Sequence, residues 1–253
     1  MATTFLTAEW RKLIMANYVV EEELLLPYVP VGTELDRYDG RCYVSLVGFL
    51  FQQTQLRGIR VPFHVEFEEV NLRFYVRRGE RRGVVFIREI VPRLALQLVA
   101  NSFYGEKYAM ARMRHAWKKS DRELSVSYGW TRGRRWHEMS VVASCDGRPV
   151  AVGSEEEFIT EHYWGYTARC GGWTSEYEVH HPRWEIYPVK DCAMDVDFGL
   201  VYGAQFAGLN CSQPHSVLLA EGSEVVVRSG ERLVATETKC GDSSTSCYAL
   251  RSE

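Results

Sequence analysis

The chain has 253 residues and a net charge of −3, with nearly half of its residues apolar, so it can bury a sizeable core and has no overall attraction to nucleic acid or to an anionic membrane. No apolar run reaches the roughly 18 residues of a membrane-spanning helix, and residues 1–12 lack the charged start and apolar centre of a signal peptide. We therefore expect a cytoplasmic protein with neither nucleic acid nor membrane as a partner; its oligomeric state is left open.

The first half of the chain reads as strands separated by turns. Residues 15–26 are a strand or a helix, ended by the prolines that follow, and residues 41–53 are a strand. A longer strand begins at His64, and the Gly79-Glu80 turn joins it to the apolar run 84–91 as a hairpin. Pro92 suits a first helical position, which predicts a helix over 92–103.

The second half continues the same pattern, apart from one helical turn over 154–159, where Ser154 and Glu157 match a capping box. Further strands are expected over residues 108–116, 123–131, 136–144, 151 onward, 163–168, 174–181, 186–190 and 217–227. Many strands, few helices and frequent glycine turns predict a mostly β, antiparallel domain over residues 1–233. Residues 234–253 are polar and are expected to form a disordered tail.

One face of the strand after His64 is polar. Val70, Leu72, Phe74 and Val76 alternate with the polar row Glu69, Asn71, Arg73 and Tyr75. Such a row is either a solvated surface or the lining of a cavity, and alternation alone does not decide between them. If it lines a cavity, Arg73 would hold a carboxylate or phosphate, and Asn71 and Tyr75 would orient the ligand. Tyr104 could reach the same cavity or belong to the core.

Several segments together resemble a known family. They are Phe67–Val76, Gly83–Phe86, Phe103–Tyr108, Phe158–Tyr163 and Val179–Trp184. In this order they resemble the YqjF-like bacterial proteins of unknown function, which are related in fold to acetoacetate decarboxylase. The resemblance implies a single closed, cone-shaped antiparallel β-barrel with a few short flanking helices and an enclosed cavity. It implies no settled activity.

The relation to acetoacetate decarboxylase raises the question of a lysine nucleophile. Schiff-base chemistry needs a lysine amine that is neutral near pH 7, through desolvation or a neighbouring cation. Lys107 is the candidate, but the decarboxylase has two adjacent lysines after a proline, whereas here Lys107 stands at the place of the proline and Tyr108 at that of the nucleophile. Glu106 beside it would raise the lysine pKa rather than lower it. The missing lysine pair disfavours a decarboxylase-type lyase.

Other kinds of site find little support. No His-Glu-x-x-His or Cys-x-x-Cys pattern occurs, His180 and His181 would point to opposite faces of a strand, and we expect neither a metal nor a cofactor. His162 and His181 stand among aromatic residues and are interpreted as structural. Arginine-rich turns are offset by acidic runs, which argues against a nucleic-acid groove.

The resulting hypothesis is a barrel that binds a small apolar or acid-bearing molecule, with Glu69, Asn71, Arg73, Tyr75 and Tyr104 as contacts. Whether it catalyses a reaction is uncertain. One alternative is a Schiff-base lyase acting on a β-keto acid through Lys107. Another is a structural or interaction module whose barrel interior is filled by side chains.

Overall fold

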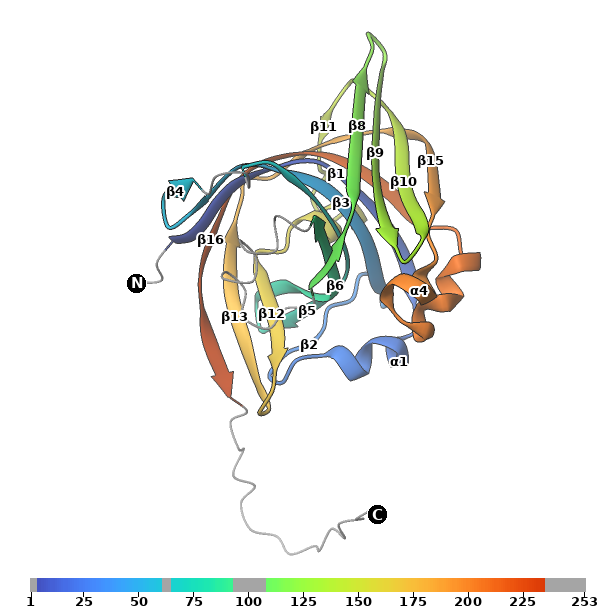
Figure 1. The fold of residues 1–253 in the computed structure, drawn as a ribbon. Helices are drawn as coiled ribbons and strands as arrows, with labels where there is room; N and C mark the ends of the chain where they lie inside the picture. The colour runs from blue at the N-terminus through green and yellow to red at the C-terminus, as the bar shows by residue number, and fades with distance from the viewer. Residues whose placement is uncertain (1–3, 61–64, 93–107, 235–253) are drawn as a thin grey trace, which may run out of the picture.

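The computed structural model describes residues 4–60, 65–92 and 108–234, and it is built mostly of β-strands (Figure 1). The larger sheet contains β1 (Thr4–Val20), β2 (Glu34–Leu35), β3 (Cys42–Leu56), β4 (Ile59–Arg60), β5 (Phe67–Arg78), β6 (Arg81–Pro92), β7 (Tyr108–Ala111), β11 (Arg148–Pro149), β12 (Trp164–Arg169), β13 (Trp173–His180), β14 (Glu185–Tyr187) and β16 (Ser216–Val234). The smaller sheet contains β8 (Met113–Lys119), β9 (Glu123–Arg132), β10 (Arg135–Ser144) and β15 (Val189–Asp195). The helical segments are α1 (Glu22–Leu25), η1 (Leu26–Tyr28), α3 (Glu155–Thr160), α4 (Phe198–Tyr202) and η2 (Ala204–Cys211).

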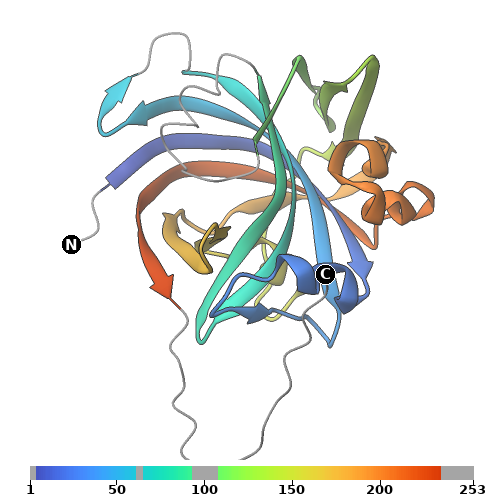
Figure 2. The same ribbon diagram turned by 60° about the horizontal axis from the view of Figure 1, so that its bottom comes forward.

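The main strands pair in a ring. The order β1-β3-β5-β6-β12-β13-β16 returns to its start because β16 also pairs with β1. Figure 2 shows these strands curving around a common interior. The junction between β6 and β12 is the shortest of the ring, with only Trp164 opposite Gly83 and Gly165 opposite Val84.

The strand pairing is mostly antiparallel, as predicted, with two exceptions. The β6–β12 and β6–β7 pairs are parallel. A second sheet was not predicted either, although its strands lie close to the expected ranges; its order is β15-β10-β9-β8. Residues 151–154, expected as the start of a strand, form a turn before α3 instead.

Two hydrophobic clusters hold these parts together. One cluster fills the inside of the ring and includes Met15, Val47 and Val225. The other lies between the outer face of the ring and the second sheet with α4, and includes Leu72 and Tyr128. Between them, β5 is buried on both faces from Val70 to Val76.

The expected turn and cap are present. Gly79 has φ 58° at the first position of the two-residue loop between β5 and β6, a conformation that suits glycine in a type II′ hairpin turn. At the start of α3, the Ser154 side chain accepts a hydrogen bond from the Glu157 N–H, as predicted, while the Glu157 carboxylate accepts one from the Gly153 N–H at 2.6 Å. The helix expected over 92–103 lies outside the described residues, except that Pro92 ends β6. The predicted tail is outside them as well, apart from Val234.

Candidate ligand pocket inside the ring

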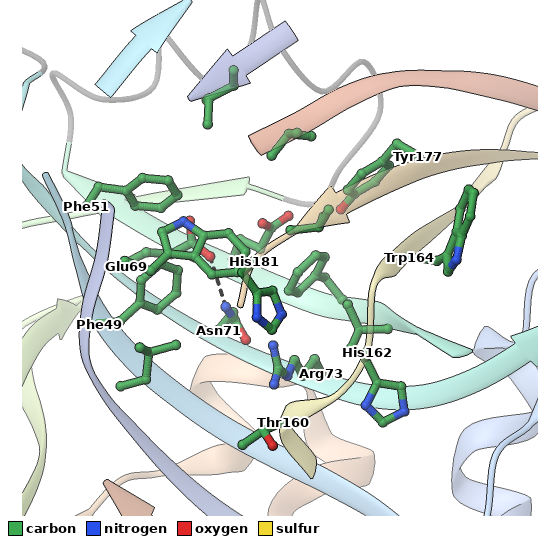
Figure 3. Close-up of a pocket in the computed structure, with 18 of the residues that line it drawn as sticks. Phe49, Phe51, Glu69, Asn71, Arg73, Thr160, His162, Trp164, Tyr177 and His181 are labelled. Atoms are coloured by element: carbon green, nitrogen blue, oxygen red, sulfur yellow. Dashed lines mark hydrogen bonds between the residues drawn. The ribbon is translucent and has the colours of Figure 1, made fainter. Parts of the chain in front are cut away.

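A pocket opens among the side chains inside the ring (Figure 3). Its volume is about 60 Å³, which at ~10–15 Å³ for each water position has room for about four to six water molecules. Most of its wall is aromatic or aliphatic, with Trp10, Phe49, Phe51, Phe67, Phe86 and Trp184 among the lining residues. A few polar side chains converge on this apolar wall, which is the usual composition of a small-molecule site.

The polar row of β5 supplies three of these side chains. Glu69, Asn71 and Arg73 line the pocket and are 4%, 1% and 8% exposed, so this face of β5 is not a solvated surface. The alternation places the apolar residues of β5 against the second sheet and the polar row inside the ring, which follows from the two-residue period of a strand. Tyr104 and Lys107 lie outside the described residues.

Tyr75 belongs to the same buried face but lies beside the pocket rather than in its wall. Its hydroxyl shares a 2.6 Å hydrogen bond with Ser45, whose hydroxyl in turn donates to the Asn17 side chain. Its ring packs on His162, with 4.5 Å between the ring centroids. Tyr75 therefore supports the pocket wall, and a direct ligand contact for it stays a prediction.

A β-bulge adds Glu89 to the polar group. The β5–β6 register shifts between Leu72, opposite Arg88, and Arg73, opposite Phe86. The extra residue reverses the alternation of β6, so that Phe86 and Glu89 both line the pocket although they are three positions apart. The Tyr108 hydroxyl, also in the wall, donates to Glu89 at 3.1 Å.

Arg73 has no counter-charge within ion-pair distance among the residues that the structure describes. Its Nη2 is 3.5 Å from the carbonyl oxygen of Ile159 and 4.0 Å from the Met15 sulfur, and its buried Nε has no hydrogen-bond partner there. In Figure 3 its guanidinium lies near Asn71 and below the ring of His181. A buried arginine without a carboxylate is costly, and a ligand anion would remove that cost.

Two histidines that the sequence placed in a structural role also line the pocket. Burial lowers the pKa of His162 to about 4, with the charges of Arg82 and Arg73 acting in the same direction, and burial also lowers the pKa of His181. Both rings are therefore neutral at neutral pH. Both histidines pack against aromatic rings, as expected, and both also line the pocket.

Behind the pocket, His162 belongs to a charged cluster. Its Nε2 is 3.4 Å from the Asp36 carboxylate, which accepts a 2.7 Å hydrogen bond from Arg82 Nε. Although burial opposes it, hydrogen bonds from His162 and Arg82 hold the pKa of Asp36 below its usual value. This cluster fixes the edge of the pocket formed by α3 and the residues after it.

No set of three or more histidine, cysteine, aspartate or glutamate side chains within the described ranges is arranged to hold a metal ion. None of the helices in those ranges is both long and apolar enough to cross a membrane.

Comparison with known proteins gives relatives in sequence and in fold. Residues 7–224 match the family DUF2071, described as "Uncharacterized conserved protein (COG2071)". The "Uncharacterized protein YqjF" of Bacillus subtilis (strain 168) is 26% identical over 182 residues, which cover 69% of this chain and 72% of YqjF.

Solved structures of low sequence identity share the fold. An acetoacetate decarboxylase-like enzyme from Sphingomonas wittichii RW1 superposes with a TM-score of 0.63 at 11% identity, over 92% of this chain and 95% of that one. Acetoacetate decarboxylase from Legionella pneumophila gives 0.62 at 11% identity, over 92% and 88%. The enduracididine biosynthesis enzyme MppR complexed with pyruvate gives 0.57 at 14% identity, over 92% and 90%.

Proposed function

Because the chain belongs to DUF2071, whose description names no activity, we propose from the pocket itself that the protein binds a small carboxylic acid inside its ring of strands. In this proposal the ring acts as a closed barrel around the ligand, and Arg73 holds the carboxylate. Glu69 and Asn71 complete the polar wall, with Tyr75 behind them and Tyr104 as a further contact. The setting we propose is the bacterial cytoplasm.

The observation that carries the proposal is the burial of Arg73 without a counter-charge among the residues that the structure describes. Arginine presents paired N–H groups that match a carboxylate, and such a pair is strongest where water is excluded. The pocket, with room for about four to six water molecules, suits a small acid. Two relatives in fold support the same class of ligand, since one was solved with pyruvate and another is named for acetoacetate.

Calorimetry with matched ligands tests the proposal. Propionate and propionamide have the same shape, but only propionate is charged, so the wild-type protein should bind propionate and not the amide. Arg73→Met keeps an unbranched side chain and removes the guanidinium group with its charge. We expect it to weaken propionate binding by about 30-fold or more, since breaking a buried charge pair costs roughly 2 kcal/mol at least.

The matched control is Arg37→Met. Arg37 is exposed and pairs with Glu22 away from the pocket, so its loss should leave the affinity unchanged. Equal binding of propionate and propionamide, or full affinity in Arg73→Met, would contradict the proposal.

A Schiff-base lyase acting on a β-keto acid through Lys107 is the second candidate. It is favoured by the acetoacetate decarboxylase-like neighbours and by the presence of Tyr108, the next residue in sequence, in the pocket wall. Incubation with acetoacetate or pyruvate, borohydride reduction and intact mass spectrometry test it, with Lys107→Ala as control. An adduct that is lost in Lys107→Ala would establish imine chemistry; no adduct with either acid would reject it for these substrates.

The third candidate, a module with a filled interior, is disfavoured by the cavity and by the charge of Arg73 facing it. If none of the acids binds, this candidate becomes the leading one.

A further inference from the structure

The orientation of Asn71 is fixed by its neighbour. The Asn71 side chain donates through Nδ2 to a Glu69 carboxylate oxygen at 2.9 Å. A carboxylate only accepts hydrogen bonds, so the amide nitrogen and oxygen are assigned without ambiguity. The other atom, Oδ1, is buried and has no donor among the described residues. Asn71 therefore offers an acceptor at the pocket wall.

His181 is fixed by the same logic. Its Nδ1 lies 2.9 Å from the carbonyl oxygen of Pro182, which only accepts, so Nδ1 carries the proton. The ring stacks on Trp184, with centroids 4.2 Å apart, and packs at a tilt against Tyr163, with centroids 4.8 Å apart, and these contacts restrain its orientation. Its remaining atom, Nε2, receives no hydrogen bond from the described part of the chain.

The protonation state of His181 follows from its surroundings. Burial is the largest effect and lowers its pKa, and the charges of Arg73 and His180 lower it too. The Pro182 carbonyl and Glu161 act in the opposite direction and do not cancel this shift. A neutral ring with its proton on Nδ1 presents a lone pair at Nε2.

Beside Arg73, the polar wall thus offers two neutral acceptors of fixed orientation, Asn71 Oδ1 and His181 Nε2. The carboxylates of Glu69 and Glu89 lie in the same wall and already accept hydrogen bonds from Asn71 and Tyr108. We infer that the acid bound in this pocket is a 2-hydroxy acid, whose carboxylate contacts Arg73 and whose hydroxyl donates a hydrogen bond to His181 Nε2. This inference rests on the proposed function and adds the substituent next to the carboxylate. Figure 3 shows the required neighbours, with the His181 ring adjacent to Arg73.

Other substituents fit this wall less well. A keto oxygen has no hydrogen to donate and would face the lone pairs of both acceptors. An ammonium group would put a second positive charge beside Arg73, where the nearby acceptors Asn71 and His181 are neutral and the carboxylates of Glu69 and Glu89 already accept hydrogen bonds from Asn71 and Tyr108. A methylene group would leave both acceptors without a partner. A neutral hydroxyl is the donor that satisfies the wall.

Three acids of equal chain length test this inference by calorimetry on the full chain. Lactate, pyruvate and propionate differ only in the hydroxyl, oxygen or hydrogens at the second carbon, and alanine adds the ammonium case. We expect lactate to bind about 2- to 12-fold more tightly than propionate, the range for one net hydrogen bond. Pyruvate and alanine should bind no more tightly than propionate.

Variants at His181 connect the preference to its Nε2 atom. Asparagine can keep the hydrogen bond to Pro182 but has no group at the position of Nε2, whereas glutamine reaches that position. His181→Asn should therefore bind lactate and propionate with equal affinity, and its circular dichroism spectrum is the check that the protein is folded. His181→Gln should retain part of the preference. His180→Asn is the matched control, since the neighbouring His180 side chain is 57% exposed.

The outcomes separate this inference from the proposed function. Equal affinity for lactate, pyruvate and propionate, lost in each case with Arg73→Met, would overturn the inference and leave the acid-binding function intact. A preference for pyruvate or alanine, or a lactate preference that survives in His181→Asn, would overturn it as well. No binding of any acid would overturn both.

Discussion

Replacing Arg73 by methionine is expected to stabilise the ligand-free protein, which is the opposite of what most buried substitutions do. Arg73 is 8% exposed, the contacts of its guanidinium with Ile159 and Met15 are long, and the described residues provide no carboxylate in ion-pair distance. Burying an ion costs several kcal/mol, and the cavity beside Arg73 recovers part of this by admitting water. We therefore expect the free energy of unfolding to rise by about 1–3 kcal/mol.

Urea unfolding followed by circular dichroism measures this change. The midpoint should move to higher urea with an unchanged slope, because the surface exposed on unfolding is the same. Arg78→Met is the matched contrast: Arg78 donates two hydrogen bonds to the buried carboxylate of Glu176, at 3.0 and 3.1 Å. Its loss should destabilise the protein by about 1–3 kcal/mol. A destabilised Arg73→Met would refute the reasoning, since it would mean that Arg73 is electrostatically satisfied without a ligand.

Three further predictions concern the scaffold around the pocket. A Cβ at Gly48 would lie 2.8 Å from the Met139 sulfur and 3.0 Å from the Tyr128 ring. Gly48→Ala should therefore lower the free energy of unfolding, measured in urea, by about 1–3 kcal/mol. An unchanged urea midpoint would show that the second sheet moves aside. The pKa of His162 is about 4 in the folded protein, against an ordinary 6.5, so the imidazole binds a proton more readily in the unfolded chain. The free energy of unfolding should therefore fall as the pH drops from 6.5 to 4, and His162→Gln should remove about 3 kcal/mol of that fall. An unaltered pH profile in this variant would contradict the assignment. Ser154→Ala removes the cap of α3 and should cost about 1 kcal/mol in thermal unfolding, whereas Ser154→Asp should not.

The two faces of β5 could be predicted from sequence because a strand has a period of two. What alternation could not decide was the environment of the polar face. Glu69, Asn71 and Arg73 are as polar as any solvated row, and their burial depends on pairing with β3 and β6 and on the closing of the ring by β16, far along the chain. The sequence of β5 alone does not indicate which strands pair with it.

Glu89 and His181 show two other limits. The bulge in β6 reverses the alternation one residue before Arg88, so a regular pattern places Glu89 on the wrong face. For His181, aromatic neighbours in the sequence correctly indicated stacking, but the pocket forms only when the end of β13 meets β5 across the ring. The short helices α4 and η2 were missed because each spans only a few residues and leaves too little periodicity to detect.

The short junction between β6 and β12 has a consequence for motion. A ring of strands opens most readily where two neighbours share the shortest ladder. Here the ladder has two residue pairs, with further hydrogen bonds from the Tyr163 N–H to Arg82 and from the Tyr166 hydroxyl to Arg81. Gly83 permits this contact, because a Cβ there would lie 2.6 Å from the Trp164 carbonyl oxygen. We therefore expect the interior of the ring to exchange molecules with solvent through local opening at this junction while β1, β3 and β16 stay paired. Amide hydrogen exchange should then be faster along β12 than along β1. Access to the buried pocket would depend on local opening of this one strand pair.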